Sequence, residues 1–184
     1  GPDGLKAIAE RVNRLACIFA DGARAAGLSV TSDYFFDTVH IETDKADEVM
    51  EAAVRVGFNL RRTTRGVSLS FDETSNEQVV RTLWQIFDID ADFETCDQKR
   101  LGSVPLPLDR QSDYLTHPVF HNYRSETEMM RYLRHLADKD LALDRTMIPL
   151  GSCTMKLNSA AEMMPISWAE FADIHPFCPA EQAA

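Results

Sequence analysis

The spacing of apolar side chains switches between two periods in the first ninety residues, and this limits the folds that the chain can adopt. Near the N-terminus the apolar residues recur every three or four positions, namely Leu5, Ile8, Val12, Leu15, Ala16 and Phe19. This period predicts an amphipathic helix, which Gly27 would end. In residues 34–42 side chains alternate instead, with Val39 and Ile41 on the apolar face and His40 on the polar face. The alternation predicts a β-strand and a solvated or hydrogen-bonded His40.

Two more helices and a hairpin are predicted before residue 90. Asp44 can cap a helix whose buried side would consist of Val49, Ala52, Ala53 and Val56. Residues 58–62 and 67–71 are two short strand candidates whose close spacing predicts an antiparallel hairpin. Ser75 and Gln78 have the spacing of a capping box, which would start a helix with the apolar face Val79, Val80, Leu83, Trp84 and Phe87. We therefore predict an α+β fold, with a small mixed or antiparallel sheet and helices on one face.

After residue 90 the regular period is lost. Residues 91–113 show no sustained period, which predicts a linker, and Cys96 within it is expected to be an exposed thiol. Residues 114–184 are expected to form an extended, partly helical segment. Capping boxes at 125–128 and 167–170 would start two of its helices. The predicted division is therefore a domain at 1–90, a linker at 91–113 and a further segment at 114–184.

The last segment carries two sets of apolar side chains. One follows the first capping box and would be the packing stripe of its helix, with Met129, Met130, Leu133, Leu136 and Ala137. The other consists of Trp168, Phe171 and Phe177, which have little of this chain left to pack against. We therefore expect these three aromatic residues to contact a partner surface.

Composition excludes several classes of function. The net charge of −10 and the pI near 4.9 argue against a nucleic-acid partner, because binding phosphates requires a basic surface. No apolar run approaches the roughly 20 residues of a membrane-spanning helix. The four cysteines are far apart, which argues against a disulfide framework or a zinc site and favours a reducing compartment.

The stretch from Pro149 to Asn158 has an unusual density of short hydrogen-bonding side chains. Within seven residues it contains Ser152, Cys153, Thr154, Lys156 and Asn158. The flanking Pro149 and Gly151 favour a rigidly bent loop. Such a loop could direct hydroxyl, thiol and amide groups towards a small anion. A polar turn between a buried strand and a helix is the alternative.

His117 and His121 are four residues apart, a spacing that would direct both rings to one side of a helix. Two histidines without a third ligand are weak evidence for metal, and Pro118 disfavours a regular helix there. A metal-dependent hydrolase using both histidines is one alternative function. A stand-alone α+β protein-binding module is another.

Three stretches of the sequence resemble one enzyme family, the glycine cleavage system P-protein. They are Leu115 to Tyr132, Met147 to Asn158 (Met-Ile-Pro-Leu-Gly-Ser-Cys-Thr-Met-Lys-Leu-Asn) and Trp168 to Pro179. The similarity is close from about Tyr114 onward and looser from Gly1 to about Glu73. Because the chain also lacks an initiator methionine, we expect an internal fragment of that protein.

The resemblance implies a fold and an activity. Residues 1–90 would be the small domain that ends the first of two aminotransferase-like halves, as in fold-type I enzymes that use pyridoxal phosphate. Residues 114–184 would be the connecting segment and the start of the second, catalytic half. The family decarboxylates glycine on pyridoxal phosphate and transfers the aminomethyl group to the lipoyl arm of H-protein. The implied partners are the remainder of the P-protein, lipoylated H-protein and glycine. The implied assembly is a dimer, located in the bacterial cytoplasm or, in a eukaryote, the mitochondrial matrix.

The resemblance also implies roles for particular residues. The family's Schiff-base lysine follows a histidine in a His-Lys-Thr context, and no lysine of this chain follows a histidine. We therefore expect the catalytic lysine to lie outside this chain. The fragment alone is expected to be inactive. The residues expected to line the active site are Ser152, Cys153, Thr154, Lys156, Asn158, His117 and Arg124.

Overall fold

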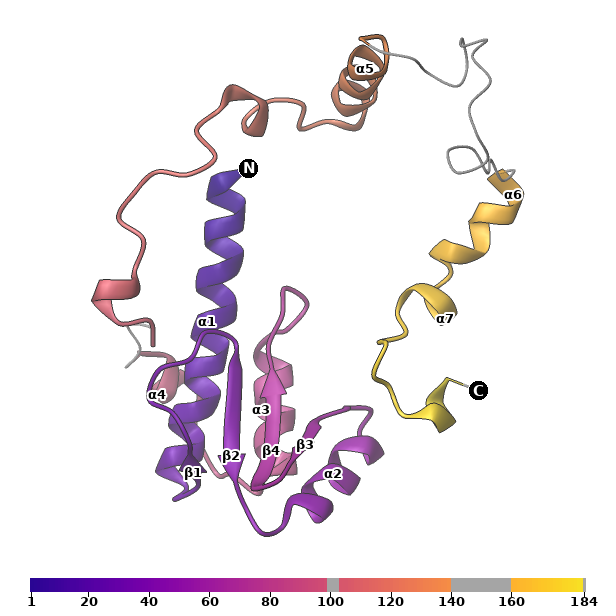
Figure 1. Cartoon of the computed structure of the whole chain (residues 1–184). Helices are drawn as coiled ribbons and strands as arrows, with labels where there is room; N and C mark the ends of the chain where they lie inside the picture. The colour runs from indigo at the N-terminus through magenta and orange to yellow at the C-terminus, as the bar shows by residue number, and fades with distance from the viewer. Residues whose placement is uncertain (99–102, 140–159, 184) are drawn as a thin grey trace. The chain divides into compact units, whose positions relative to one another are not determined.

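The computed structural model describes residues 1–98, 103–139 and 160–183 (Figure 1). The chain forms two compact units, Gly1–Asn122 and Tyr123–Ala184. The boundaries expected at residues 90 and 113 stay predictions. None of the helices in the described ranges is long and apolar enough to cross a membrane.

The first unit contains a four-stranded antiparallel sheet with the order β1-β2-β4-β3 (Figure 1). Its strands are β1 (Ser29–Val30), β2 (Thr38–Glu42), β3 (Arg61–Thr63) and β4 (Gly66–Ser70). The predicted hairpin is confirmed, because β3 and β4 pair with Thr63 opposite Gly66. Val39 and Ile41 of β2 are buried and Thr38 is exposed, as the alternation predicted. The α+β fold is therefore confirmed, and the sheet is antiparallel.

The first helix, α1 (Pro2–Ala25), supplies most of the helical side of the core. It ends before Gly27, whose φ of +83° is the left-handed conformation that stops a helix at little cost to glycine. Phe19 lies at the centre of the core, with its ring 6.1 Å from Phe71 and 5.7 Å from Phe87. The N-terminal helix predicted from the sequence is thus confirmed.

Helices α2 (Ala46–Arg55) and α3 (Glu77–Ile86) form where we predicted helices, but their caps differ. Asp44 provides no side-chain cap for α2, whose N-cap is Lys45. Val56, which we expected to be buried, is 52% exposed because it follows the end of α2. The predicted Ser75 capping box is wrong as well. Asn76 is the N-cap and accepts the N–H of Val79 at 3.2 Å.

The stretch predicted to be an irregular linker contains a helix, α4 (Phe93–Gln98), and a 3₁₀ turn, η1 (Leu106–Leu108). Helix α4 packs against α1. Cys96 is consequently buried within the core cluster, so the expectation of an exposed thiol is wrong. A six-residue helix is too short to show a clear hydrophobic period, which explains the error.

The second unit is built from short helices. In α5 (Glu126–Ala137) the predicted capping box between Ser125 and Glu128 is confirmed. The remaining elements are α6 (Ala160–Met163), η3 (Met164–Ser167), α7 (Ala169–Ala172) and η4 (Ala180–Gln182). The capping box at 167–170 is wrong, since the N-cap of α7 is Trp168 and the hydroxyl of Ser167 instead donates to the carbonyl of Met164 at 2.9 Å.

No side chain described in the second unit is buried. The stripe that we expected to pack on α5 is exposed, with Met130 at 63% and Leu133 at 56%. Trp168, Phe171 and Phe177 are exposed as well. The first unit has a hydrophobic core, whereas the described part of the second unit has none.

Candidate functional site

Five of the seven predicted site residues, Ser152, Cys153, Thr154, Lys156 and Asn158, lie outside the described residues. Their role in lining an active site stays a prediction. The structure places the other two, His117 and Arg124, in different units of the chain. Whether these two residues act together therefore stays a prediction too.

His117 is exposed and caps η2 (Pro118–Phe120), a 3₁₀ turn. Its ring Nδ1 accepts the backbone N–H of Val119 at 3.1 Å. Because a nitrogen that accepts this bond carries no proton, the neutral ring must hold its proton on Nε2. His117 therefore offers Nε2 as a hydrogen-bond donor to an acceptor outside the loop.

His121, which follows η2, hydrogen-bonds back to the backbone before that turn. Its Nε2 lies 3.1 Å from the carbonyl oxygen of Leu115, which can only accept, so Nε2 is the donor. Leu115 has a φ of +50°, a left-handed conformation that is uncommon for a leucine. The hydrogen bond from His121 helps to hold this conformation.

The two histidines have no third metal ligand beside them in the described residues. One ring nitrogen of each hydrogen-bonds to the backbone. Within residues 1–98, 103–139 and 160–183 no group of three or more His, Cys, Asp or Glu side chains could hold a metal ion. The hydrolase alternative therefore has no support in the described part of the chain.

Arg124 is exposed and lies between two ordered features of the second unit. Before it, Tyr123 has a φ of +57° and stacks on Tyr132 with ring centroids 4.1 Å apart. After it, Ser125 forms the capping box of α5. The backbone on both sides of Arg124 is thus fixed, while its guanidinium is available to an anionic group.

The polar side chains of the sheet include His40 on β2, and the hairpin carries Arg62 and Arg65. His40 hydrogen-bonds through its ring to the hydroxyls of Thr31 and Thr63, which confirms a hydrogen-bonded role. On the hairpin, Arg62 pairs with Asp47 and Arg65 pairs with Glu42, both at 2.9 Å. These guanidinium groups are neutralised within the first unit, which disfavours an anion site there.

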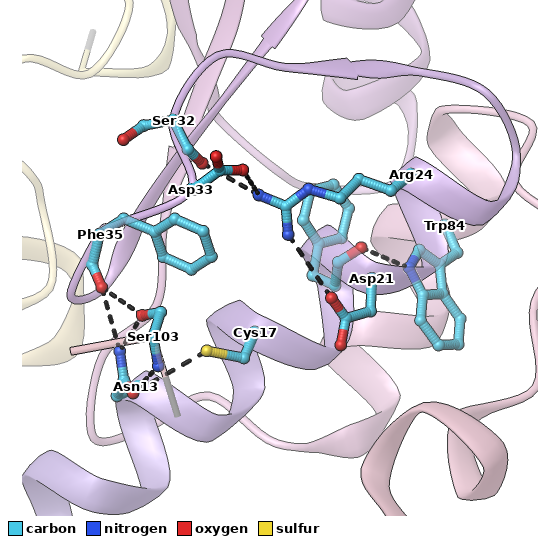
Figure 2. A network of polar contacts seen from close by, with 10 residues as sticks. Asn13, Cys17, Asp21, Arg24, Ser32, Asp33, Phe35, Trp84 and Ser103 are labelled. Atoms are coloured by element: carbon cyan, nitrogen blue, oxygen red, sulfur yellow. Dashed lines mark hydrogen bonds and ion pairs between the residues drawn. The ribbon is translucent and has the colours of Figure 1, made fainter. Parts of the chain in front are cut away.

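Sequence reasoning missed a buried polar network around Asn13, shown in Figure 2. The side-chain amide of Asn13 donates to the carbonyl of Phe35 at 3.2 Å and to the hydroxyl of Ser103 at 2.9 Å. It also donates to the carbonyl of Phe36 at 2.7 Å. Its oxygen accepts the backbone N–H of Ser103 at 3.3 Å. These bonds hold the chain after α4 against α1. The only sequence signal was a polar residue on the otherwise apolar side of α1.

Three carboxylates in the described part of the first unit have lowered pKa values, namely Asp72, Asp92 and Asp97. Partial burial opposes the charged form of Asp72, but hydrogen bonds from Thr74 and Ser75 outweigh it and hold its pKa below the ordinary value. A hydrogen bond from Arg14, at 2.5 Å, likewise lowers the pKa of Asp97. Asp97 lies on α4, so this pair joins α4 to α1. Hydrogen bonds from Thr95 lower the pKa of Asp92, which is exposed. Asp72 and Asp97 hold parts of the fold together.

The family profile of the glycine cleavage system P-protein matches residues 1–87 of this chain. Glycine dehydrogenase (decarboxylating) of a Bradyrhizobium species is 50% identical over 185 residues, which cover the whole of this chain and 19% of that protein. The chain thus resembles the P-protein family over its whole length. Proteins of the same name from Gluconobacter oxydans and Xanthomonas axonopodis pv. citri are both 51% identical, over 99% and 100% of this chain.

The P-protein resemblance expected from the sequence is thus confirmed, and it extends over both units. This chain spans about a fifth of the length of the curated relatives that it matches. The expectation of a P-protein fragment agrees with that share.

Proposed function

We propose that these 184 residues work as part of a P-protein that decarboxylates glycine and transfers the remaining aminomethyl group to the lipoyl arm of H-protein. The observation that supports the proposal is about 50% identity to glycine dehydrogenase (decarboxylating) over the whole chain. The region that aligns with these relatives includes the polar stretch from Pro149 to Asn158, where the predicted site residues cluster.

We further propose pyridoxal phosphate as the cofactor of the full enzyme. The cofactor requires a lysine, an acidic group for its ring nitrogen and donors for its phosphate. The described residues do not fit these requirements. The lysines in the described ranges are all exposed, namely Lys6, Lys45 and Lys139. None of the buried polar residues in those ranges is acidic; they are Asn13, Ser68, Ser75 and Ser103. The proposal therefore assigns the cofactor to the remainder of the P-protein.

Within this chain, Ser152, Cys153 and Thr154 would line the mouth of the active site. Their hydroxyl and thiol groups and the neighbouring amides suit a carboxylate such as that of glycine, or the incoming lipoyl arm. Lys156 and Asn158 would support them. Of the described residues, His117 would add the Nε2 donor fixed by its contact with Val119, and Arg124 a guanidinium.

The partners in this proposal are the remainder of the P-protein, in a dimer, and the lipoylated H-protein. The relatives cited above are bacterial, which favours the bacterial cytoplasm as the location.

The proposed lining role predicts the effect of Ser152→Ala and Thr154→Ala in the full-length enzyme. Each change removes a contact to a charged group, so glycine turnover should fall by at least about tenfold. Ser167→Ala is a matched control, because that hydroxyl donates only to the nearby carbonyl of Met164 among its described contacts. If the two substitutions leave the kinetics unchanged, residues 152–154 do not line the site.

A further inference from the structure

Residues 160–183 form a segment that exposes an unusual amount of apolar surface. Its large apolar side chains are between 44% and 89% exposed, namely Met163, Met164, Ile166, Trp168, Phe171, Ile174 and Phe177. None of residues 161–183 is buried. An apolar surface of this extent marks an interaction site in a folded protein.

The helices of residues 160–183 are too short to be stable in isolation. Helices α6 and α7 have four residues each, far fewer than an isolated helix needs for stability in water. Trp168 and Phe171 touch only loosely, with ring centroids 6.3 Å apart. The structure of the segment therefore depends on burying these side chains elsewhere.

The charge of residues 160–183 indicates the charge of the surface that they can bind. Residues 160–183 contain Glu162, Glu170, Asp173 and Glu181 but no lysine or arginine. A complementary surface has an apolar centre and a basic rim. A second copy of this chain is a poor match, because its net charge is −10 and the hairpin arginines Arg62 and Arg65 are already paired.

We propose that residues 160–183 dock onto the part of the P-protein that lies beyond these 184 residues. The curated relatives are about five times as long as this chain, so a P-protein has ample further surface to cover the segment. The inference rests on the part of the proposed function that makes this chain a segment of a longer P-protein. It adds the docking segment and the character of its receiving surface, an apolar groove with a basic rim.

The two tryptophans make the proposal testable, because Trp84 is 2% exposed in the first unit and Trp168 is 51% exposed in the segment. Acrylamide quenching would be measured in the 184-residue chain and in the full-length P-protein that contains it. A neutral quencher is required because the segment is acidic. The signal of Trp168 is obtained from the difference between each protein and its Trp168→Phe variant.

We expect Trp168 to be readily quenched in the 184-residue chain and to be protected to the level of Trp84 in the full-length protein. In the full-length protein Phe171→Ser and Phe177→Ser should restore quenching of Trp168, and Glu170→Gln should do so in part. Val54→Ser is the matched control, since Val54 is 49% exposed on α2 in the first unit, and it should have no effect.

Equal quenching of Trp168 in both proteins would overturn the proposal. Protection in the 184-residue chain alone, together with a dimeric mass, would also overturn it and would identify a second copy as the partner. Glycine turnover by the same full-length sample separates this test from the proposed function. Protection of Trp168 in a protein without turnover would contradict the proposed activity and leave the docking intact.

Discussion

Gly22→Ala tests the close contact between α1 and α3 on which the core of the first unit depends. A Cβ atom at residue 22 would lie 2.5 to 2.6 Å from the indole atoms Cε2, Cζ2 and Nε1 of Trp84. Trp84 is 2% exposed, and its Nε1–H donates to the carbonyl of Phe19 at 3.2 Å. Figure 2 shows the indole of Trp84 in the unsubstituted protein. In the variant the indole has to move, and its hydrogen bond is strained or lost.

Two opposing effects set the size of the change. Replacing glycine by alanine inside a helix stabilises it by up to about 1 kcal/mol. Overpacking a buried side chain costs about 1 to 3 kcal/mol, and a strained buried hydrogen bond adds about 1 kcal/mol. The steric cost is larger, so we expect Gly22→Ala to lower the free energy of unfolding by about 1 to 3 kcal/mol.

Urea unfolding followed by far-UV circular dichroism would measure this difference without relying on the altered indole. Gly4→Ala is the matched control on the same helix, because no atom lies within 4 Å of the new Cβ. It should leave stability unchanged or slightly raise it. If Gly22→Ala is as stable as Gly4→Ala, α1 and α3 do not pack as described.

Two further substitutions test other contacts of the first unit. Asn13→Ala removes the side chain that hydrogen-bonds to the carbonyls of Phe35 and Phe36 and to Ser103. The free energy of unfolding, measured by urea unfolding, should therefore fall by about 2 to 3 kcal/mol. A loss below about 0.5 kcal/mol would contradict the network. Asp72 has a lowered pKa, so its charged form stabilises the fold above the ordinary value of 3.8 and loses this effect as the pH falls below it. Asp72→Asn should therefore flatten the acid side of the stability profile, and an unchanged profile would show that Asp72 makes no such contribution.

The elements that the sequence predicted well depend on local patterns. The alternation around Val39 and Ile41 and the short loop at residues 63–66 are sufficient to specify a hairpin and its neighbouring strand. The cap of α3 was displaced by one residue because Ser75 is engaged by Asp72 and cannot cap the helix. Competing turn contacts of this kind are hard to rank from sequence alone.

Non-local contacts account for the other errors. Asn13 and Ser103 are 90 residues apart, and no local pattern connects them. The burial of Cys96 likewise follows from the packing of α4 on α1. For the candidate site, the density of polar side chains at 152–158 could be recognised from sequence, whereas the ring orientation of His117 required the backbone contact with Val119.

Release of labelled carbon dioxide from glycine tests the central claim most directly. The assay would compare the 184-residue chain with the full-length P-protein that contains it, each supplied with pyridoxal phosphate and lipoylated H-protein. We expect release by the full-length protein and none by the 184-residue chain. Release by the 184-residue chain alone, or no release by the full-length protein, would contradict the account.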